Sequence, residues 1–512
     1  MRLCEKSSLL QLPTAKLITS FQPNKKAMNE YVKGLDRKQT ALFPETLEEY
    51  IDQDNPVRFI DAFIDSLSIE KLGFKNSTPT QVGRPSYNPK DLLKLYVYGY
   101  LNQTRSSRKL EGECHRNIEV MWLMKKLAPD FKTIADFRKD NIDCIKGVFR
   151  EFVKLCIGLD LYGAKCIAID GTKFKAANGL DRNFNRKKLV YRIEEADKQV
   201  SKYLTEIEAE DRKEEQANSK HTGVLQQKVQ KLIKRKEEYS ELLTKLKESK
   251  QNEVSMVDPD CRLMKNRGRI EPCYNGQVAV DDKNHLIVDY NITNAPNDIC
   301  QLSSMAIGAK EIFEAKSIEA VADKGYFSFV QIKDCVDNGV VPYVPEQNRY
   351  GVGFVKRKGV PTREFHVDRF LYDMGTDTFV CPGGNKLVFS YLDHAHQKNI
   401  RVYRTDACFS CEFFMTKCTL NKHGRTLWRW EHAEVLDAMR ERMLREPERM
   451  ALRKRLVEHP FGTMKRAFNH GYLLLKGLRK VSGEVGFTML AYNIRRVLNI
   501  LGPNFMQVFE LF

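Results

Sequence analysis

The spacing of hydrophobic residues changes near residue 163 of this 512-residue chain. From about residue 46 to 150, apolar positions recur at helical spacing, and Pro89 opens an apolar-rich helix. Beyond residue 163, short apolar runs typical of strands appear, and helical spacing returns over about 431–500. The predicted strands cover residues 165–170, 276–281, 286–293, 318–323 and 340–345. Residues 1–45 show weak periodicity and are predicted to be a loosely ordered arm.

The order of these elements predicts a mixed α/β fold. Strands come first, a helix follows near Asp298, a further strand comes next, and helices complete the chain. This is the element order of an RNase H-like domain, predicted here over residues 163–500. The predicted fold class is therefore α/β, with a helical domain at 46–150 ahead of the RNase H-like domain.

The helical segment carries basic residues close to its predicted turns. Short helices with such turns and exposed basic side chains fit a helix-turn-helix-like DNA-binding unit. An all-helical packing domain with solvated charges fits the same local pattern. Thr133 and Asp136 resemble a capping box, which predicts a helix start at this point. The candidate DNA contacts are Arg105, Arg108, Arg138 and Lys139.

Two segments interrupt the predicted α/β domain, and the first covers residues 185–252. Its apolar residues step by alternating three and four positions on both sides of a polar break, with Lys236 out of pattern. This predicts an antiparallel helical hairpin. A structural or oligomeric role fits it better than direct DNA contact by its lysines. The apolar positions are Ile193, Ala196, Val200, Tyr203, Ile207, Leu225, Val229, Leu232, Tyr239, Leu243 and Leu246.

The second interruption, residues 346–430, contains a cluster of cysteines. A Cys-x-x-Cys pair with one cysteine upstream and one downstream can supply four thiolates for a tetrahedral structural zinc ion. Four unconnected thiols on a partly buried knuckle are the alternative. The four cysteines are Cys381, Cys408, Cys411 and Cys418, and the substitute ligands are His394, His396 and His423.

Charge narrows the class of partner. Lysine and arginine number 84 against 67 acidic residues, which gives a formal net charge of +17. This excess favours a phosphate-rich partner such as nucleic acid, although a basic protein with another role has the same composition. The sequence shows no secretory signal after Met1 and no apolar run long enough for a membrane span. The 13 cysteines are mostly scattered, so a cytoplasmic protein with reduced thiols is expected.

Three acidic residues stand in positions that suit metal chemistry. Asp170 and Asp323 each end an apolar run, and Glu458 lies in a basic, helix-like stretch. Singly, a strand-end aspartate usually forms a turn and a glutamate among arginines usually forms a solvated ion pair. Together they can hold two divalent metals about 3.5–4 Å apart, the arrangement that serves in-line phosphodiester displacement.

At this point the residues resemble those of a known family, the bacterial DDE insertion-sequence transposases with an RNase H-like catalytic domain. The resemblance runs from about residue 46 to 500. It rests on the motifs that begin at Asn55 (Asn-Pro-Val-Arg-Phe), Gly83 (Gly-Arg-Pro), Asp91 (Asp-Leu-Leu-Lys), Phe131 (Phe-Lys-Thr-Ile-Ala-Asp-Phe-Arg), Ile169 (Ile-Asp-Gly-Thr-Lys), Gln277 (Gln-Val-Ala-Val-Asp), Asp323 (Asp-Lys-Gly-Tyr) and Glu458 (Glu-His-Pro-Phe-Gly).

The resemblance implies that Asp170, Asp323 and Glu458 form a catalytic triad that binds two Mg²⁺ (or Mn²⁺) ions. Related transposases carry Tyr, Arg, Glu and Lys at set spacing, and Lys465 fits the lysine, seven residues after the glutamate on one helical face. Ala451 and Lys454 stand at the tyrosine and arginine positions, so this chain departs from the pattern there.

The implied activity is DNA transposition: cleavage at the ends of an insertion sequence, then joining of the 3′ ends to target DNA. The implied partners are the terminal inverted repeats, target double-stranded DNA and a second copy of the chain in a homodimer or higher assembly, associated with the nucleoid. A metal-dependent nuclease without strand transfer and a non-catalytic DNA-binding protein derived from a transposase are the alternatives.

Three further residues have two interpretations each. Trp428 and Trp430 alternate with basic residues and could stack on an unpaired base, although tryptophans more often pack in a core. His459, next to Glu458, could carry a proton, although a structural hydrogen bond is the favoured role.

Overall fold

The computed structural model describes residues 46–78, 85–211, 219–249, 253–346, 360–394, 399–503 and 505–506. The predicted arm at 1–45 lies outside the described residues, as does His396. By its internal contacts the chain divides into two compact units, Met1–Glu49 and Tyr50–Phe512. Within the described part of the chain, no helix combines the length and the apolar character needed to cross a membrane.

Six helices make up the predicted helical segment. Asn55 and Asn88 cap the first two through their side-chain oxygens, and a proline follows each cap at the first helical position. Helix α2 is buried along almost its whole length, so it forms the centre of this group. The helices are α1 (Pro56–Ser66), α2 (Pro89–Leu101), α3 (Ser107–Arg116), α4 (Ile118–Leu123), α5 (Phe131–Asn141) and α6 (Ile145–Gly158).

The predicted capping box is wrong. Helix α5 begins at Phe131, and Asp130 caps it by accepting hydrogen bonds from the backbone N–H groups of Lys132 and Thr133. The Thr133 hydroxyl donates to the same aspartate, so Thr133 lies inside the first turn. An aspartate one turn earlier satisfies the free N–H groups and therefore sets the helix start.

A mixed six-stranded sheet follows in the chain. Its order is β4-β5-β1-β7-β8, and the long strand β5 also pairs with β6. Strand β1 is antiparallel to β5 and parallel to β7, and β7 is parallel to β8. The strands are β1 (Cys166–Lys175), β4 (Arg262–Asn266), β5 (Arg269–Asp281), β6 (Ile287–Thr293), β7 (Ile318–Val321) and β8 (Val340–Tyr343). Each of the five predicted strands has a counterpart here, which confirms a mixed α/β fold with a helical N-terminal region.

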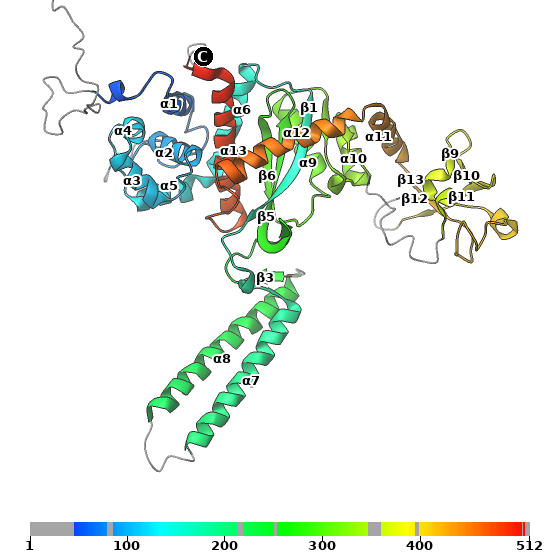
Figure 1. Cartoon of the computed structure of the whole chain (residues 1–512), viewed down its shortest axis with the longest axis horizontal. Coiled ribbons are helices and arrows are strands. Elements are labelled where there is room, and N and C mark those ends of the chain that lie inside the picture. The colour runs from blue at the N-terminus through cyan, green and yellow to red at the C-terminus, as the bar shows by residue number, and fades with distance from the viewer. Residues whose placement is uncertain are drawn as a thin grey trace, which may run out of the picture. The chain divides into compact units, whose positions relative to one another are not determined.

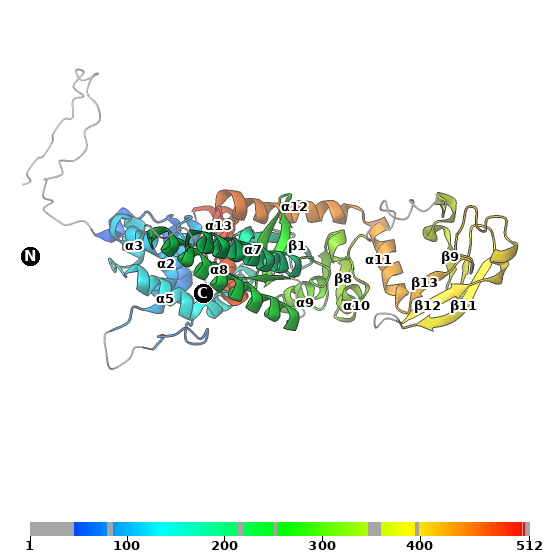
Figure 2. The same cartoon turned by 90° about the horizontal axis from the view of Figure 1, so that it is seen from below.

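Helices α9 (Leu302–Ile312) and α10 (Phe329–Asp337) connect the later strands, and α9 begins four residues beyond Asp298. After the sheet come α11 (Ala433–Arg445), α12 (Glu448–Gly462), a π-helical turn (Thr463–Ala467) and α13 (Leu478–Leu501). Helix α12 lies beside β1, as Figures 1 and 2 both show. Helix α13 is buried over most of its length and packs against α2, α6 and β6. The N-terminal helices and the sheet therefore share one hydrophobic core.

Residues 185–252 contain the predicted pair of helices. Helices α7 (Arg186–Asp211) and α8 (Ser219–Glu248) run antiparallel side by side (Figure 1), and the short strands β2 (Asn183–Asn185) and β3 (Glu253–Ser255) pair at their base. Lys236, which breaks the apolar pattern, forms an ion pair with Asp197 of the facing helix at 2.5 Å. The polar exception in the pattern is therefore a cross-helix contact.

The cysteine-containing segment has a sheet of its own. Its five antiparallel strands follow the order β13-β12-β11-β10-β9. They are β9 (Leu371–Asp373), β10 (Thr378–Val380), β11 (Lys386–Asp393), β12 (Ile400–Arg404) and β13 (Leu427–Trp430). A second, small hydrophobic cluster lies under this sheet and consists of Phe365, Phe370, Leu387, Tyr403, Cys418 and Leu427.

Candidate active site

Asp170 and Asp323 lie on neighbouring parallel strands. Strand β1 pairs with β7 through Ala168 and Val321, and each aspartate stands two residues further along its own strand direction. The parallel pairing of β1 and β7 ends just before both aspartates, while β1 continues to Lys175, so the two carboxylates lie near each other at this edge of the parallel pairing. The structure therefore brings together two of the three predicted acidic residues.

The local backbone fixes both aspartates. The Asp170 carboxylate accepts a hydrogen bond from the backbone N–H of Gly171 at 2.8 Å. Asp323 caps a 3₁₀ turn (Lys324–Tyr326) and accepts from the Gly325 N–H at 2.7 Å. Such short-range bonds to backbone donors hold a carboxylate in one orientation.

Burial dominates the electrostatics of Asp170. Desolvation raises the pKa of Asp170 to about 6, and the negative charges of Asp323 and Asp298 act in the same direction. The Arg453 guanidinium opposes them, with Nη1 at 3.4 Å from the Asp170 carboxylate. The positive charge of Arg453 therefore stabilises the ionised form of Asp170.

Asp298, which in the sequence indicated only the approach to a helix, lies close to Asp170. Its Oδ1 accepts hydrogen bonds from the side chains of Lys173, at 3.3 Å, and of Asn275 and Gln277, both at 2.7 Å. Gln277 in turn accepts from the buried Tyr326 hydroxyl through its Oε1. Tyr326 ends the turn that Asp323 caps, so this polar network connects β1, β5 and the two later aspartates.

Gly171 makes room for this network. A Cβ at this position would lie 2.5 Å from Gln277 Nε2 and 2.9 Å from Asp298 Oδ1, closer than non-bonded atoms approach. The glycine after Asp170 therefore serves close packing under the carboxylates. The motifs at Gln277 and Asp323 were part of the family resemblance, but no local pattern indicated that their side chains meet.

The Glu458 side chain points away from the two aspartates, into solvent. Its side chain is 66 % exposed and lies 3.9 Å from Lys454 on the outer face of α12. Leu456 and Val457 are buried, and Arg453 is the α12 residue that contacts Asp170. Within the ranges that the structure describes, no three His, Cys, Asp or Glu side chains are arranged to hold a metal ion. The assignment of Glu458 as a metal ligand stays a prediction.

Lys465 does not share a face with Glu458. It lies in the π-helical turn after α12, and its ammonium donates to the backbone carbonyl of Lys173 on β1 at 3.0 Å. Burial and the nearby charges of Arg267 and Lys173 lower the pKa of Lys465 to about 8. A π turn adds a residue per turn and so shifts the helical phase, which is why the seven-residue spacing did not align the two side chains.

The prediction that Arg105 is an exposed DNA contact is wrong. Its side chain is 6 % exposed, and it donates to the Tyr472 carbonyl at 2.9 Å and lies 3.5 Å from the Glu484 carboxylate on α13. Arg138 is half-buried, beside the ring of Tyr96. Both arginines face the shared core because α13 brings a buried carboxylate to it. Arg108 and Lys139 are exposed and remain candidate DNA contacts.

Two other predictions have clear outcomes. The Trp430 ring is buried and stacks on Phe329 with ring centres 5.6 Å apart, whereas Trp428 is 62 % exposed. His459 Nδ1 lies 2.8 Å from the Tyr492 hydroxyl, in agreement with the favoured structural role. Trp430 is therefore a core residue, and only Trp428 is positioned to meet a partner.

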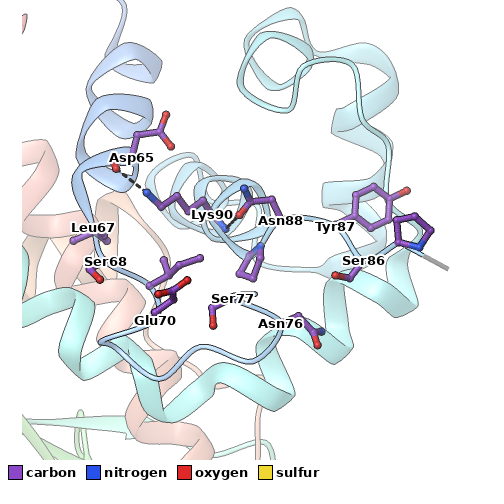
Figure 3. Close-up of a pocket in the computed structure, with 13 residues that line it drawn as sticks. Asp65, Leu67, Ser68, Glu70, Asn76, Ser77, Ser86, Tyr87, Asn88 and Lys90 are labelled. Atoms are coloured by element: carbon purple, nitrogen blue, oxygen red, sulfur yellow. Dashed lines mark hydrogen bonds between the residues drawn. The ribbon is translucent and has the colours of Figure 1, made fainter. Parts of the chain in front are cut away.

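A cavity of about 600 Å³ lies away from Asp170 and Asp323, neither of which lines it. It lies between the turn after α1 and the start of α2, where Lys90 donates to the Asp65 carbonyl at 2.7 Å (Figure 3). Asp65 and Glu70 line it together with serines and prolines, so it is polar and partly acidic. A backbone phosphate has the wrong charge for these two carboxylates.

Comparison with known families identifies the class of protein. Residues 45–140 match the family described as Transposase domain (DUF772), and residues 380–498 match the family described as Transposase DDE domain. No curated protein and no solved structure matches the chain. The chain is a DDE transposase, an enzyme of DNA transposition, with an N-terminal transposase domain ahead of its DDE domain.

Proposed function

We propose that this transposase cleaves the phosphodiesters at the ends of an insertion sequence and joins the freed 3′ ends to target DNA. The observation that supports it is the pair formed by Asp170 and Asp323 on adjacent parallel strands, with Asp298 beside them. Two carboxylates at the edge of a mixed sheet suit metal-assisted phosphoryl transfer. The substrates are double-stranded DNA: the terminal inverted repeats of the element and a target site.

The catalytic domain is RNase H-like and spans residues 163–500, with two insertions. Residues 185–252 lie between β1 and β4 of the large sheet, and residues 346–430 lie between β8 and α11. Both segments can be removed without changing the strand order, which supports reading them as insertions. The hairpin that α7 and α8 form has a structural or oligomeric role, in a dimer or a larger assembly on DNA.

The donor set suits Mg²⁺ or Mn²⁺. Hard divalent cations prefer carboxylate oxygens, and Asp170 and Asp323 would hold them. Bound metals supply a water of lowered pKa and stabilise the leaving 3′ oxygen. In the structure the Arg453 guanidinium provides the positive charge next to Asp170. A metal ion bound by Asp170 would have to displace this guanidinium from the carboxylate.

Glu458 would complete the site after a rearrangement of α12. Arg453 and Glu458 are five residues apart, which separates them by about 140° around a helix. For the Glu458 side chain to take the place of the Arg453 side chain beside the aspartates, α12 must turn about its axis. Pro460 and the π-helical turn that follows weaken the regular hydrogen bonding exactly at this end of α12, which favours such a change.

The remaining residues act on the DNA. Lys465, held at the edge of β1, would bind a phosphate near the cut as a point charge. Arg108 and Lys139 would contact the backbone of the terminal repeats, and such binding weakens steeply with salt. The polar network of Gln277, Asp298 and Tyr326 would keep the aspartates in position during both steps.

Cleavage and joining by purified protein on end DNA test this proposal. We expect Asp170→Asn and Asp323→Asn to reduce Mg²⁺-dependent cleavage at least about a thousandfold and to leave DNA binding in place, because each change removes a metal-binding charge and keeps the shape. Asp337→Asn, the same change at an exposed position of α10, is the matched control. Normal cleavage by either aspartate variant would contradict the proposal.

Glu458→Gln decides whether α12 rearranges. Loss of cleavage in this variant supports a turned helix in the active complex, and normal cleavage removes Glu458 from the site. Pre-cut ends with a free 3′-hydroxyl test the second step separately. If the protein cleaves end DNA but forms no joined product, strand transfer is contradicted and the protein acts as a metal-dependent nuclease.

A further inference from the structure

Four cysteines from three turns line one small cavity in the segment 360–430. Cys381 comes from the turn between β10 and β11, Cys408 and Cys411 from a 3₁₀ turn and its end, and Cys418 from the loop before β13. The cavity has a volume of about 20 Å³. A space of roughly 10–15 Å³ holds one water molecule, so this cavity has room for a single ion. Its remaining lining contains no histidine, and His394 and His423 are exposed elsewhere.

Backbone N–H groups in these turns donate to two of the four sulfurs. The Cys411 N–H donates to the Cys408 carbonyl at 3.2 Å, which closes the Cys-x-x-Cys turn. The backbone N–H of Asn385 donates to Cys381 Sγ at 3.3 Å, and that of Arg425 donates to Cys408 Sγ at 3.4 Å. Backbone donors to sulfur stabilise the ionised form and orient it, which is the usual outer shell of a thiolate ligand.

One glycine is required for this arrangement. Gly424 has φ +82°, and a Cβ there would lie 3.2 Å from the Cβ of Cys408. A larger residue would be strained in its backbone and would crowd Cys408. The absence of a side chain at Gly424 thus lets the loop before β13 pack closely against the turn that holds Cys408.

The charges around the cavity call for a cation. The four cysteines and Arg425 line the same small cavity. Four thiolates therefore cannot coexist here without added positive charge. A divalent ion with four thiolates carries a net charge of −2, and the Arg425 guanidinium, which lies over the Phe370 ring at 5.1 Å, offsets part of it.

The size of the local core gives an independent reason for a cross-link. Six buried residues support five strands, and all four cysteines are free thiols, so no disulfide joins them. A core this small contributes little stability, and small units of this kind commonly depend on a disulfide or a metal. A metal would connect three turns that the hydrophobic cluster alone holds weakly.

We propose that Cys381, Cys408, Cys411 and Cys418 bind one structural zinc ion, with Arg425 as its charge-compensating neighbour. Four soft thiolates suit tetrahedral Zn²⁺ and leave no open position, so this ion takes no part in DNA cleavage. The side chains must first turn inward, since the described residues contain no ready-made metal geometry. The site is independent of the proposed strand-transfer activity and of the aspartates.

Metal content of the full chain is the first test. Protein purified without added metal should contain about one zinc per chain by elemental analysis and native mass spectrometry. The double variant Cys408→Ser, Cys411→Ser should lose it, whereas Cys144→Ser, at an equally half-buried cysteine, and Asp170→Asn should retain it. Wild-type protein free of zinc and unable to take it up would overturn the proposal.

Cobalt provides a second readout that does not need the cysteine variants to fold. Wild-type chain exchanged with Co²⁺ should show the intense visible bands of tetrahedral cobalt and a near-ultraviolet thiolate band. Bands of octahedral intensity would exclude a four-thiolate site. Arg425→Gln should weaken zinc binding about 10–100-fold, and Arg425→Lys should restore part of the loss, because a compensating charge and not the stacking is required. Equal affinities in all three proteins would remove Arg425 from the proposal.

Proteolysis locates the effect. Removal of zinc by a chelator should make residues 360–430 sensitive to protease while the rest of the chain stays protected, because binding energy of a structural metal appears as local folding stability. Unchanged protection of this segment after complete metal removal would show that the ion, where bound, is not structural.

Discussion

The carboxylate edge of the large sheet and the cysteine cavity of the small sheet both gather metal-ligand side chains, but they are supported in opposite ways. The aspartates lie on strands of an extensive core that continues through α13 into the N-terminal helices. The cysteines lie on turns over a cluster of six buried residues. The first site is positioned by the fold, whereas the second, as we propose, would itself hold its part of the fold together. Loss of a metal from the first site would therefore leave the fold intact, whereas loss of the proposed metal from the second would destabilise the small sheet.

The sharpest way to disturb the large core is to break its buried ion pair. Arg105→Ala leaves the Glu484 carboxylate without its guanidinium partner, in a place where it is 1 % exposed. We expect a loss of about 3–5 kcal/mol in the free energy of unfolding, because an unpaired buried charge is costly. Urea unfolding measures it, with the exposed Arg108→Ala as control, expected to change stability by less than about 0.5 kcal/mol. A small effect at Arg105 would mean that α13 is not held through this pair.

A matched pair of leucines separates the two cores. Leu490→Ala on α13 should lower the global stability by about 2–5 kcal/mol, because it opens a cavity in the shared core. Leu387→Ala on β11 should leave the main unfolding transition in place and increase hydrogen exchange only within 360–430. If both variants lower the same single transition equally, the small sheet is part of the large cooperative unit.

The network under the aspartates should affect catalysis more than stability. Gln277→Leu removes the donor to Asp298 and the acceptor of the Tyr326 hydroxyl. We expect cleavage to fall about 10–100-fold and the Mg²⁺ requirement to rise, as when outer-shell partners of a metal site are lost. Tyr326→Phe, which removes only the hydroxyl, should have a smaller effect. An unchanged Mg²⁺ dependence in both variants would show that the network does not position the carboxylates.

A buried histidine, His470, gives the large core a pH dependence. Burial lowers the pKa of His470 from 6.5 to about 3, and Arg105 acts in the same direction. The unfolded chain thus binds a proton below pH 6.5 that the folded chain does not, so stability is lost as the pH falls from 6.5 towards 3. The slope from this one group is at most about 1.4 kcal/mol per pH unit.

His470→Phe should flatten that slope between pH 6 and about 4. Neither ring nitrogen of His470 has a hydrogen-bond partner among the described residues, so an apolar ring is a fair replacement. Urea unfolding at several pH values measures the effect. A slope identical to wild type would assign the acid sensitivity to other groups.

The sequence alone predicted most of the helices and strands and grouped the four cysteines. Apolar runs marked the five strands, including β1, which contains Asp170, and β7, which ends two residues before Asp323, because a buried strand is encoded within a few residues. The heptad pattern predicted α7 and α8 for the same reason. The cysteine spacing indicated four thiols that belong together, and the structure places all four around one cavity.

Other features depended on contacts between distant segments, and only the tertiary structure decided them. Arg105 is buried because Glu484, far along the chain, lies opposite it. Arg453 and not Glu458 faces Asp170 because packing of Leu456 and Val457 sets the rotation of α12, and the π turn shifts Lys465 out of phase. Asp298 and Gln277 meet beneath Gly171 through pairing of β1 with β5. A local pattern fixes where a helix or strand begins, whereas its rotation and partners follow from the free energy of the whole core.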